Sequence, residues 1–216
     1  MNTQKIPSDT LVLIKMPTSI EGFDEITDGG LLRDQTSLVI GGPGSSNTVF
    51  ALHTLVNRAR QWGEPGIFVA FEENARQIVT NAASFSWDLL TLEKEGKFTF
   101  FDACLPADVV QSGTFDLSAM LAGLKAKATK MGARLIVFDS IDVLLTLLHD
   151  PFSEQNEIYR IRDWLSQNDL TGIITTRIES SDPLLLNTIA LCSSWRIAWS
   201  YFVIASPNES RCANSS

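Results

Sequence analysis

Short runs of apolar, often β-branched residues alternate along this chain with longer segments in which apolar residues recur every three or four positions. Runs of the first kind are typical of buried strands, and segments of the second kind are typical of helices that pack on a sheet. Strands are predicted at residues 36–40, 66–73, 97–103, 134–140 and 171–176. Helices are predicted at residues 48–62, 75–85, 115–132 and 156–169.

This alternation predicts the fold class. Strands that are each followed by a helix form right-handed βαβ units, so we expect an α/β domain with a mostly parallel sheet and helices on both faces. Ligands of such sheets bind at the carboxyl ends of the strands. Four polar segments fall there, and we expect them to share one site: the glycine-rich turn after residue 40, Glu72–Glu73, Asp139–Ser140 and Thr175–Thr176.

The segment LVIGGPGSSNT, residues 38–48, has the outline of a phosphate-binding loop, G-x-x-x-x-G-K-[ST]. In such loops backbone N–H groups bind the phosphates, a lysine adds a positive charge, and the final hydroxyl ligates Mg²⁺. Gly41 and Thr48 fit the pattern, whereas Ser46 replaces a glycine and Asn47 replaces the lysine. Losing a charge-assisted hydrogen bond costs about 1.5–3 kcal/mol, and a side chain in a glycine conformation costs about 1–3 kcal/mol. Taken alone, the segment is equally consistent with a structural glycine turn.

The polar residues at the other strand ends each allow two interpretations. Asp139 follows a buried strand, as the Mg²⁺-binding carboxylate of P-loop NTPases does, or it caps the next turn; the upstream loop favours the metal role. Glu72 and Glu73 are able to polarise an attacking water, but acidic residues are also common in solvated turns and at helix N-termini. Thr175 and Thr176 are candidates for contacting a γ-phosphate, although threonine is ordinary in strands.

Composition narrows the location and the partners. The net charge of −8 argues against nucleic acid as a partner. No charge-free apolar run is long enough for a membrane span, and the N-terminus shows no secretory signal. The three cysteines are widely spaced and match no disulfide or metal framework, so we expect a reducing, cytoplasmic compartment.

Taken together and in this order, the motifs resemble the KaiC family of circadian clock proteins from about residue 13 to about residue 183. The resemblance implies a RecA-like P-loop ATPase domain of a type that often occurs in tandem and forms hexameric rings. The motifs that carry it are SIEGFDEITDGGL (19–31), the phosphate loop, EPGIFVAFEE (64–73), NAASFSWDL (81–89), RLIVFDS (134–140) and TGIITTR (171–177).

The resemblance also implies roles for individual residues. Mg²⁺ would bind Thr48 and Asp139, Glu72 would activate the attacking water, and Glu73 would assist it. The family includes ATPases and Ser/Thr autokinases, but no kinase substrate site is visible in this sequence. The residues implied for binding ATP are Gly41, Gly42, Pro43, Gly44, Ser45, Ser46, Asn47, Thr48, Val49 and Asp139, with Ser84 near the nucleotide.

The tail departs from the family pattern, so we divide the chain into a KaiC-like domain at residues 1–183 and an atypical tail at residues 184–216. These 33 tail residues hold three charged side chains and seven serines. We hypothesise a change of reading frame near residues 184–187, because codons chosen from Asn187 onward give a second frame that resembles the family's next segment. The family's last strands would then be missing, and an unpaired sheet edge would remain unless residues 197–205 pair as a substitute strand.

Two functions follow from these patterns. The first is an ATP-binding, Mg²⁺-dependent ATPase domain whose hydrolysis is impaired by Asn47. The second is a non-catalytic structural or regulatory module that keeps only the fold and the oligomer contacts. A third class, a DNA recombination domain, conflicts with the acidic balance and the lack of a basic, aromatic-rich loop.

Overall fold

The computed structural model describes residues 14–42, 44–103, 116–148, 151–177 and 199–204. Pro43, the three cysteines and the tail other than residues 199–204 lie outside these described residues.

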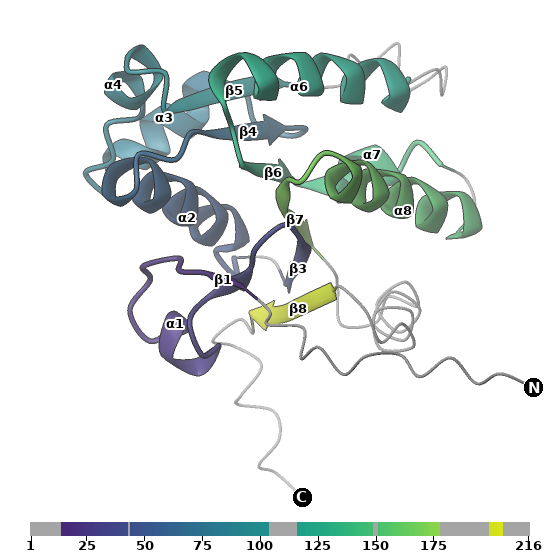
Figure 1. Cartoon of the computed structure of the whole chain (residues 1–216). Coiled ribbons are helices and arrows are strands. Elements are labelled where there is room, and N and C mark those ends of the chain that lie inside the picture. The colour runs from purple at the N-terminus through teal and green to yellow at the C-terminus, as the bar shows by residue number, and fades with distance from the viewer. Residues whose placement is uncertain (1–13, 43, 104–115, 149–150, 178–198, 205–216) are drawn as a thin grey trace, which may run out of the picture.

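A parallel sheet forms the centre of the domain, and its strand order is β5-β4-β6-β7-β3-β8 (Figure 1). Each strand pairs in parallel with its neighbours. The five predicted strands are confirmed to within a few residues at each end, and the expected α/β class is correct. The strands are β3 (Thr36–Gly41), β4 (Gly66–Ala70), β5 (Phe98–Asp102), β6 (Leu135–Asp139), β7 (Thr171–Arg177) and β8 (Trp199–Ile204).

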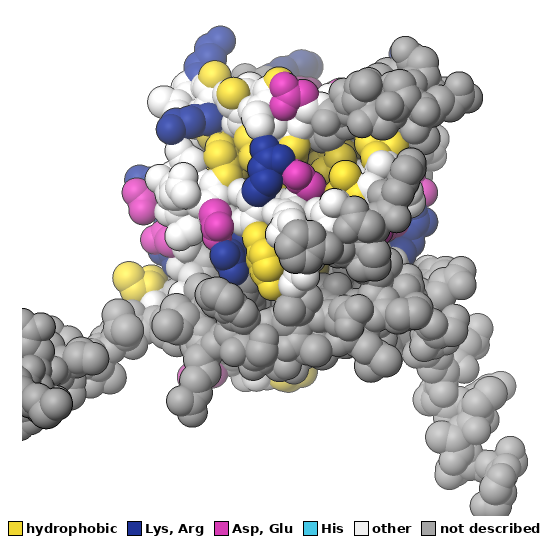
Figure 2. Space-filling model, turned by 90° about the vertical axis from the view of Figure 1, so that its right-hand side faces the viewer, with side chains coloured by type: hydrophobic (Ala, Val, Ile, Leu, Met, Phe, Trp, Pro, Cys, Tyr) yellow, Lys and Arg dark blue, Asp and Glu magenta, His cyan; other side chains and the backbone are white. Residues whose placement is uncertain are grey.

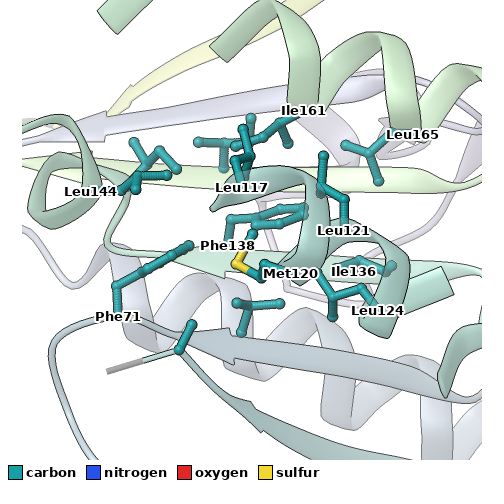
Figure 3. Packing of buried hydrophobic residues seen from close by; sticks show 14 of the residues in the cluster. Phe71, Leu117, Met120, Leu121, Leu124, Ile136, Phe138, Leu144, Ile161 and Leu165 are labelled. Carbon is teal, nitrogen blue, oxygen red and sulfur yellow. The ribbon is translucent and has the colours of Figure 1, made fainter. Parts of the chain in front are cut away.

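Helices cover both faces of this sheet because apolar residues point alternately to its two sides. In β4, Ile67 and Val69 pack with one group of helices, and Phe68 and Ala70 pack with the other. The first group is α6 (Leu117–Met131), α7 (Ile141–Leu145) and α8 (Pro151–Gln167), and the second is α2 (Asn47–Gln61), α3 (Ala75–Ala83) and α4 (Leu89–Lys94). Of the two clusters of buried apolar residues described, the one between the sheet and the α6–α8 layer is the larger. Figure 3 shows side chains of this core, including Met120, Leu121 and Leu124 of α6, Ile136 and Phe138 of β6, and Ile161 and Leu165 of α8.

Helix boundaries follow local signals where these exist. Gly132, the predicted end of α6, adopts a left-handed conformation with φ 70°, as a helix-ending glycine does. The predicted first residue of the last helix was wrong: α8 begins at Pro151 and not at residue 156. Proline is favoured in the first turn of a helix, because the N–H groups there have no acceptor within the helix and the missing N–H of proline costs no hydrogen bond.

Several short elements have no counterpart among the predictions. Strands β1 (Lys15–Met16) and β2 (Leu31–Leu32) form an antiparallel pair, with the single-turn helix α1 (Phe23–Ile26) between them. Helices α4 and α7 are also short. Elements of two to six residues show no apolar periodicity, so a pattern search does not detect them.

The expected unpaired edge of the sheet is occupied. Strand β8 pairs in parallel with β3 over six residues, from Thr36 opposite Trp199 to Gly41 opposite Ile204. The structure thus shows the alternative outcome, in which residues within 197–205 pair as a substitute strand, and not the unpaired edge. The hypothesis of a changed reading frame stays a prediction.

Candidate functional site

The loop between β3 and α2 has the backbone of a tight glycine turn. Gly44 and Ser46 both adopt left-handed conformations, with φ of 78° and 66°. Ser46 directly precedes α2, and its side chain makes no capping hydrogen bond. A left-handed conformation costs a non-glycine residue about 1–2 kcal/mol. The sequence-based expectation that Ser46 occupies a position suited to glycine is therefore confirmed.

Asn47 forms part of the inner structure of the loop. Its side chain is buried, and its Nδ2 donates a hydrogen bond to the carbonyl oxygen of Thr176 at 3.0 Å. Its Oδ1 accepts a hydrogen bond from the Ser45 hydroxyl at 2.9 Å. A Cβ atom at Gly41 would overlap the side chains of Ser45 and Asn47. The amide thus joins the loop to the end of β7, at the position where a P-loop carries its lysine.

Asp139, at the end of β6, receives hydrogen bonds from two hydroxyl groups. The Thr48 hydroxyl lies 3.0 Å from each carboxylate oxygen, and the Thr175 hydroxyl donates to Oδ1 at 2.5 Å. Burial raises the pKa of Asp139 to about 6; the hydroxyls of Thr175 and Thr48 oppose this rise, and the Glu73 and Asp142 carboxylates add to it. The structure thus gives Thr175 a polar partner at the site, which the pattern of an ordinary strand did not indicate.

Glu72 and Glu73 follow β4 and face the same hollow as the loop and Asp139. Glu72 forms an ion pair with Arg177, the last residue of β7. Glu73 accepts a long hydrogen bond of 3.4 Å from Nδ2 of Asn81. The hollow has a volume of about 170 Å³, and its lining residues are Gly42, Gly44, Ser45, Ser46, Asn47, Thr48, Glu72, Glu73, Asp139, Ser140 and Arg177. The four strand-end segments therefore meet at one edge of the sheet, as the βαβ pattern predicted.

Comparison with known proteins agrees with this geometry. A family model described as the KaiC ATPase matches residues 16–190. The chain belongs to the KaiC family.

Individual KaiC proteins are similar over most of the chain. The circadian clock protein KaiC2 of Synechocystis is 40% identical over 169 residues, which are 78% of this chain and 30% of that protein. The circadian clock oscillator protein KaiC of Synechococcus elongatus is 37% identical over 179 residues, which are 82% of this chain and 34% of that protein. The chain therefore spans about a third of the length of these relatives. The fold is the RecA-like P-loop fold of KaiC ATPase domains.

The donor atoms at the centre of this KaiC site suit Mg²⁺. Mg²⁺ prefers oxygen ligands and is commonly held by one or two protein groups together with phosphates and water. The Thr48 hydroxyl and the Asp139 carboxylate are such oxygen donors and lie within 3.0 Å of each other. Among the described residues there is no cluster of three or more His, Cys, Asp or Glu side chains that would point to another type of metal site.

Two residues implied by the KaiC resemblance, Ser84 and Val49, do not line the hollow. Ser84 is exposed at the end of α3, where its hydroxyl donates to the carbonyl of Asn81 at 2.6 Å. Val49, in the first turn of α2, packs against the core on the α2 side. Neither residue belongs to the described lining of the hollow. Pro43 lies outside the described residues, and the nucleotide role of all three stays a prediction.

One functional candidate was missed by the sequence analysis. Arg177 appeared only as the last letter of the TGIITTR motif. The register places it opposite Gly41, the first residue of the loop. The rule that ligands bind at the carboxyl ends of parallel strands was the signal that would have identified it.

One face of the molecule carries charged side chains of both signs among its described residues. In the view of Figure 2, Lys and Arg side chains of the described residues are interspersed with Asp and Glu side chains and do not form a basic strip. Within the described residues, none of the helices combines the length and apolar character that crossing a membrane requires.

Proposed function

We propose that this KaiC-family domain binds ATP together with Mg²⁺ at the loop between β3 and α2. The observation that carries the proposal is the meeting of Thr48 and Asp139, at 3.0 Å, beside a glycine-rich loop that opens a helix. In P-loop NTPases the corresponding hydroxyl and strand-end carboxylate hold the metal, while backbone N–H groups bind the phosphates. Bound Mg²⁺ would neutralise phosphate charge at this place.

The charges around the hollow make the metal essential to this proposal. Glu72, Glu73 and Asp139 contribute three carboxylates, and Arg177 contributes a single positive charge. ATP would add several further negative charges. We therefore expect ATP to bind only with a divalent cation, because like charges at short range repel strongly in a partly buried site.

We propose slow hydrolysis of ATP as the reaction. Glu72 and Glu73 lie at the hollow and supply the carboxylates needed to orient and deprotonate a water molecule. The loop contributes a neutral amide in place of a lysine, and loss of one transition-state donor typically lowers a rate by about 10²–10³. A carboxylate base of this kind serves water or a Ser/Thr hydroxyl, and we favour hydrolysis because the sequence shows no kinase substrate site.

A second function, the non-catalytic module, is favoured by one specific observation. Both polar atoms of the Asn47 side chain are bonded within the protein, to Thr176 and to Ser45, so the residue serves the structure of the loop. A domain with a loop of this kind is able to keep the fold and its contacts with other domains without turning over nucleotide.

We also propose assembly with other KaiC-like domains, either copies of this chain or a tandem domain. The relatives carry about three times the matched length, and their names place them in circadian clocks. Sedimentation velocity with and without ATP and Mg²⁺ tests this: a nucleotide-dependent increase in mass supports assembly, and a monomer under all conditions contradicts it.

Titration calorimetry with ATP and a phosphate-release assay together distinguish the two functions. The wild-type chain is expected to bind ATP in the presence of Mg²⁺, and to lose binding with EDTA or with Thr48→Ala. Phosphate release then measures turnover, which is expected to fall further with Glu72→Gln. Binding without any turnover supports the non-catalytic module. Absence of binding in the wild type, with binding gained by the combined Ser46→Gly and Asn47→Lys changes, would refute the proposed function.

A further inference from the structure

Arg177 lies beside the phosphate loop although it is 130 positions away from Asn47 in the chain. The parallel register of β7 and β3 places it opposite Gly41, where the loop begins. The residue before it, Thr176, accepts the hydrogen bond from the Asn47 amide. The backbone of Arg177 is thus held next to the loop by contacts on both sides of the loop's glycine turn.

Its side chain faces the hollow and carries the positive charge there. Of the described residues that line this hollow, Arg177 is the single Lys or Arg. The side chain is 45% exposed, so an incoming ligand is able to reach it. In the loop itself the position of the lysine is held by a neutral amide.

The present partners of Arg177 are acidic. Its guanidinium forms an ion pair with Glu72, whose side chain is 43% exposed, and its Nε lies 3.9 Å from the Asp142 carboxylate. Ion pairs between half-exposed side chains contribute little net stability, because water competes for both groups. The backbone N–H of Arg177 donates separately to Asp142 at 3.1 Å. The side chain can therefore change partners while the strand end stays in place.

We propose that Arg177 is the phosphate-binding cation of this site and supplies, from the end of β7, the charge that Asn47 does not provide. This inference rests on the proposed binding of ATP. On binding, the guanidinium exchanges Glu72 for oxygens of the terminal phosphates, which its planar set of donors fits well. The exchange is favoured because the phosphates carry more negative charge than one carboxylate. It also frees Glu72 to act on water only when nucleotide is present.

Replacing Arg177 tests the binding role. In calorimetry with ATP and Mg²⁺, Arg177→Gln is expected to weaken binding about tenfold, the lower end for losing a charge-assisted hydrogen bond. Arg177→Lys keeps the charge and is expected to recover most of this loss. The matched control is Arg160→Gln on α8, because Arg160 is 47% exposed, is also ion-paired with a glutamate and lies outside the hollow. Its ATP affinity is expected to equal that of the wild type.

A double-mutant cycle tests the exchange of partners. Glu72→Gln releases Arg177 and is expected to tighten ATP binding about two- to fivefold more than Glu73→Gln. Glu73→Gln removes the same charge from the same hollow, and the described contact of Glu73 is with Asn81. When Arg177 is also replaced by Gln, Glu72→Gln and Glu73→Gln are expected to change the ATP affinity by the same factor.

The outcomes separate the inference from the proposed function. If the wild type binds ATP and Arg177→Gln binds it equally well, the inference is wrong and the proposed function stands. Equal effects of Glu72→Gln and Glu73→Gln on binding would likewise overturn the exchange of partners. If the wild type and Thr48→Ala both fail to bind ATP, the proposed function fails and the inference falls with it.

Discussion

The side-chain amide of Asn47 donates to the backbone carbonyl of Thr176 at 3.0 Å, and this bond joins the first residue of α2 to the end of β7. In a P-loop the same position carries a lysine that points to the phosphates. Here Asn47 holds the loop in place through its hydrogen bonds with Thr176 and Ser45. Changes at position 47 are therefore expected to affect folding as well as nucleotide binding.

Asn47→Ala is expected to destabilise the domain. The change leaves the buried carbonyl of Thr176 and the Ser45 hydroxyl without their partner, which costs about 1–3 kcal/mol. Urea denaturation measures this loss. Asn168→Ala is a suitable control, because its Nδ2 also donates to a backbone carbonyl, that of Trp164, but from a half-buried position. An effect of Asn47→Ala no larger than that of Asn168→Ala would contradict a structural role for Asn47.

Ser46→Gly is expected to stabilise the domain. Glycine adopts the left-handed conformation of residue 46 without strain, which adds about 1–2 kcal/mol to the free energy of unfolding. The greater freedom of glycine in the unfolded chain removes about 0.5–1 kcal/mol of this gain. A net increase of about 0.5–1 kcal/mol in the free energy of unfolding should follow. Ser84→Gly serves as the opposite case, since Ser84 has φ −64° and glycine there is expected to destabilise. A loss of stability with Ser46→Gly would show that the Ser46 side chain has a role in the loop.

Gly41→Ala and Gly42→Ala are expected to differ sharply although the two glycines are adjacent. A Cβ at Gly41 would overlap the side chains of Ser45 and Asn47, whereas a Cβ at Gly42 meets no atom within 4 Å. Overpacking of this kind costs about 1–3 kcal/mol, so we expect a clear drop in melting temperature for Gly41→Ala alone. Thermal melts of the two variants are the measurement. Similar melting temperatures would mean that the loop rearranges around residue 41.

The stability of the ligand-free domain is expected to depend on pH through Asp139. Its pKa in the folded state is raised from 3.8 to about 6, mainly by burial. A raised pKa means that folding favours the protonated carboxyl. The contribution to stability is thus fully present below about pH 4, and it is lost as the pH rises through 6. A shift of about two units corresponds to about 3 kcal/mol.

Asp139→Asn isolates this effect from the other carboxylates. Unfolding free energies measured between pH 4 and pH 7 should fall more steeply for the wild type than for Asp139→Asn. Above about pH 7, where Asp139 is ionised in both the folded and the unfolded state, the difference between the two proteins should become constant. Parallel curves across the whole range would indicate that Asp139 titrates near its ordinary pKa.

The sequence predicted the parts of the site that depend on local signals. Gly41 and Thr48 were identified by the loop pattern, and Asp139 by its place after a buried strand. The contacts of Asn47 and Arg177 were not predictable in this way, because both depend on β7 lying beside β3. That adjacency is set by the order of strands in the sheet, which joins positions more than a hundred residues apart.

The same distinction applies to the fold. The central strands and the long helices have clear periodicity, so their existence and approximate bounds were predicted. For Thr175 the sequence left two interpretations open, because no local pattern shows that its hydroxyl donates to Asp139 on the neighbouring strand β6. Short helices such as α4 and α7 depend on packing against the completed sheet.

The pairing of strand β8 bears on how the fold tolerates changes of amino-acid sequence at the edge of the sheet. It pairs with β3 along the whole length of that strand, yet its residues 199–204 lie beyond the matched residues 16–190. Parallel pairing uses backbone N–H and C=O groups, which every residue except proline provides in full. At the outermost position of a sheet the side chains can therefore vary widely while β3, the strand that leads into the glycine-rich loop, stays paired on both sides.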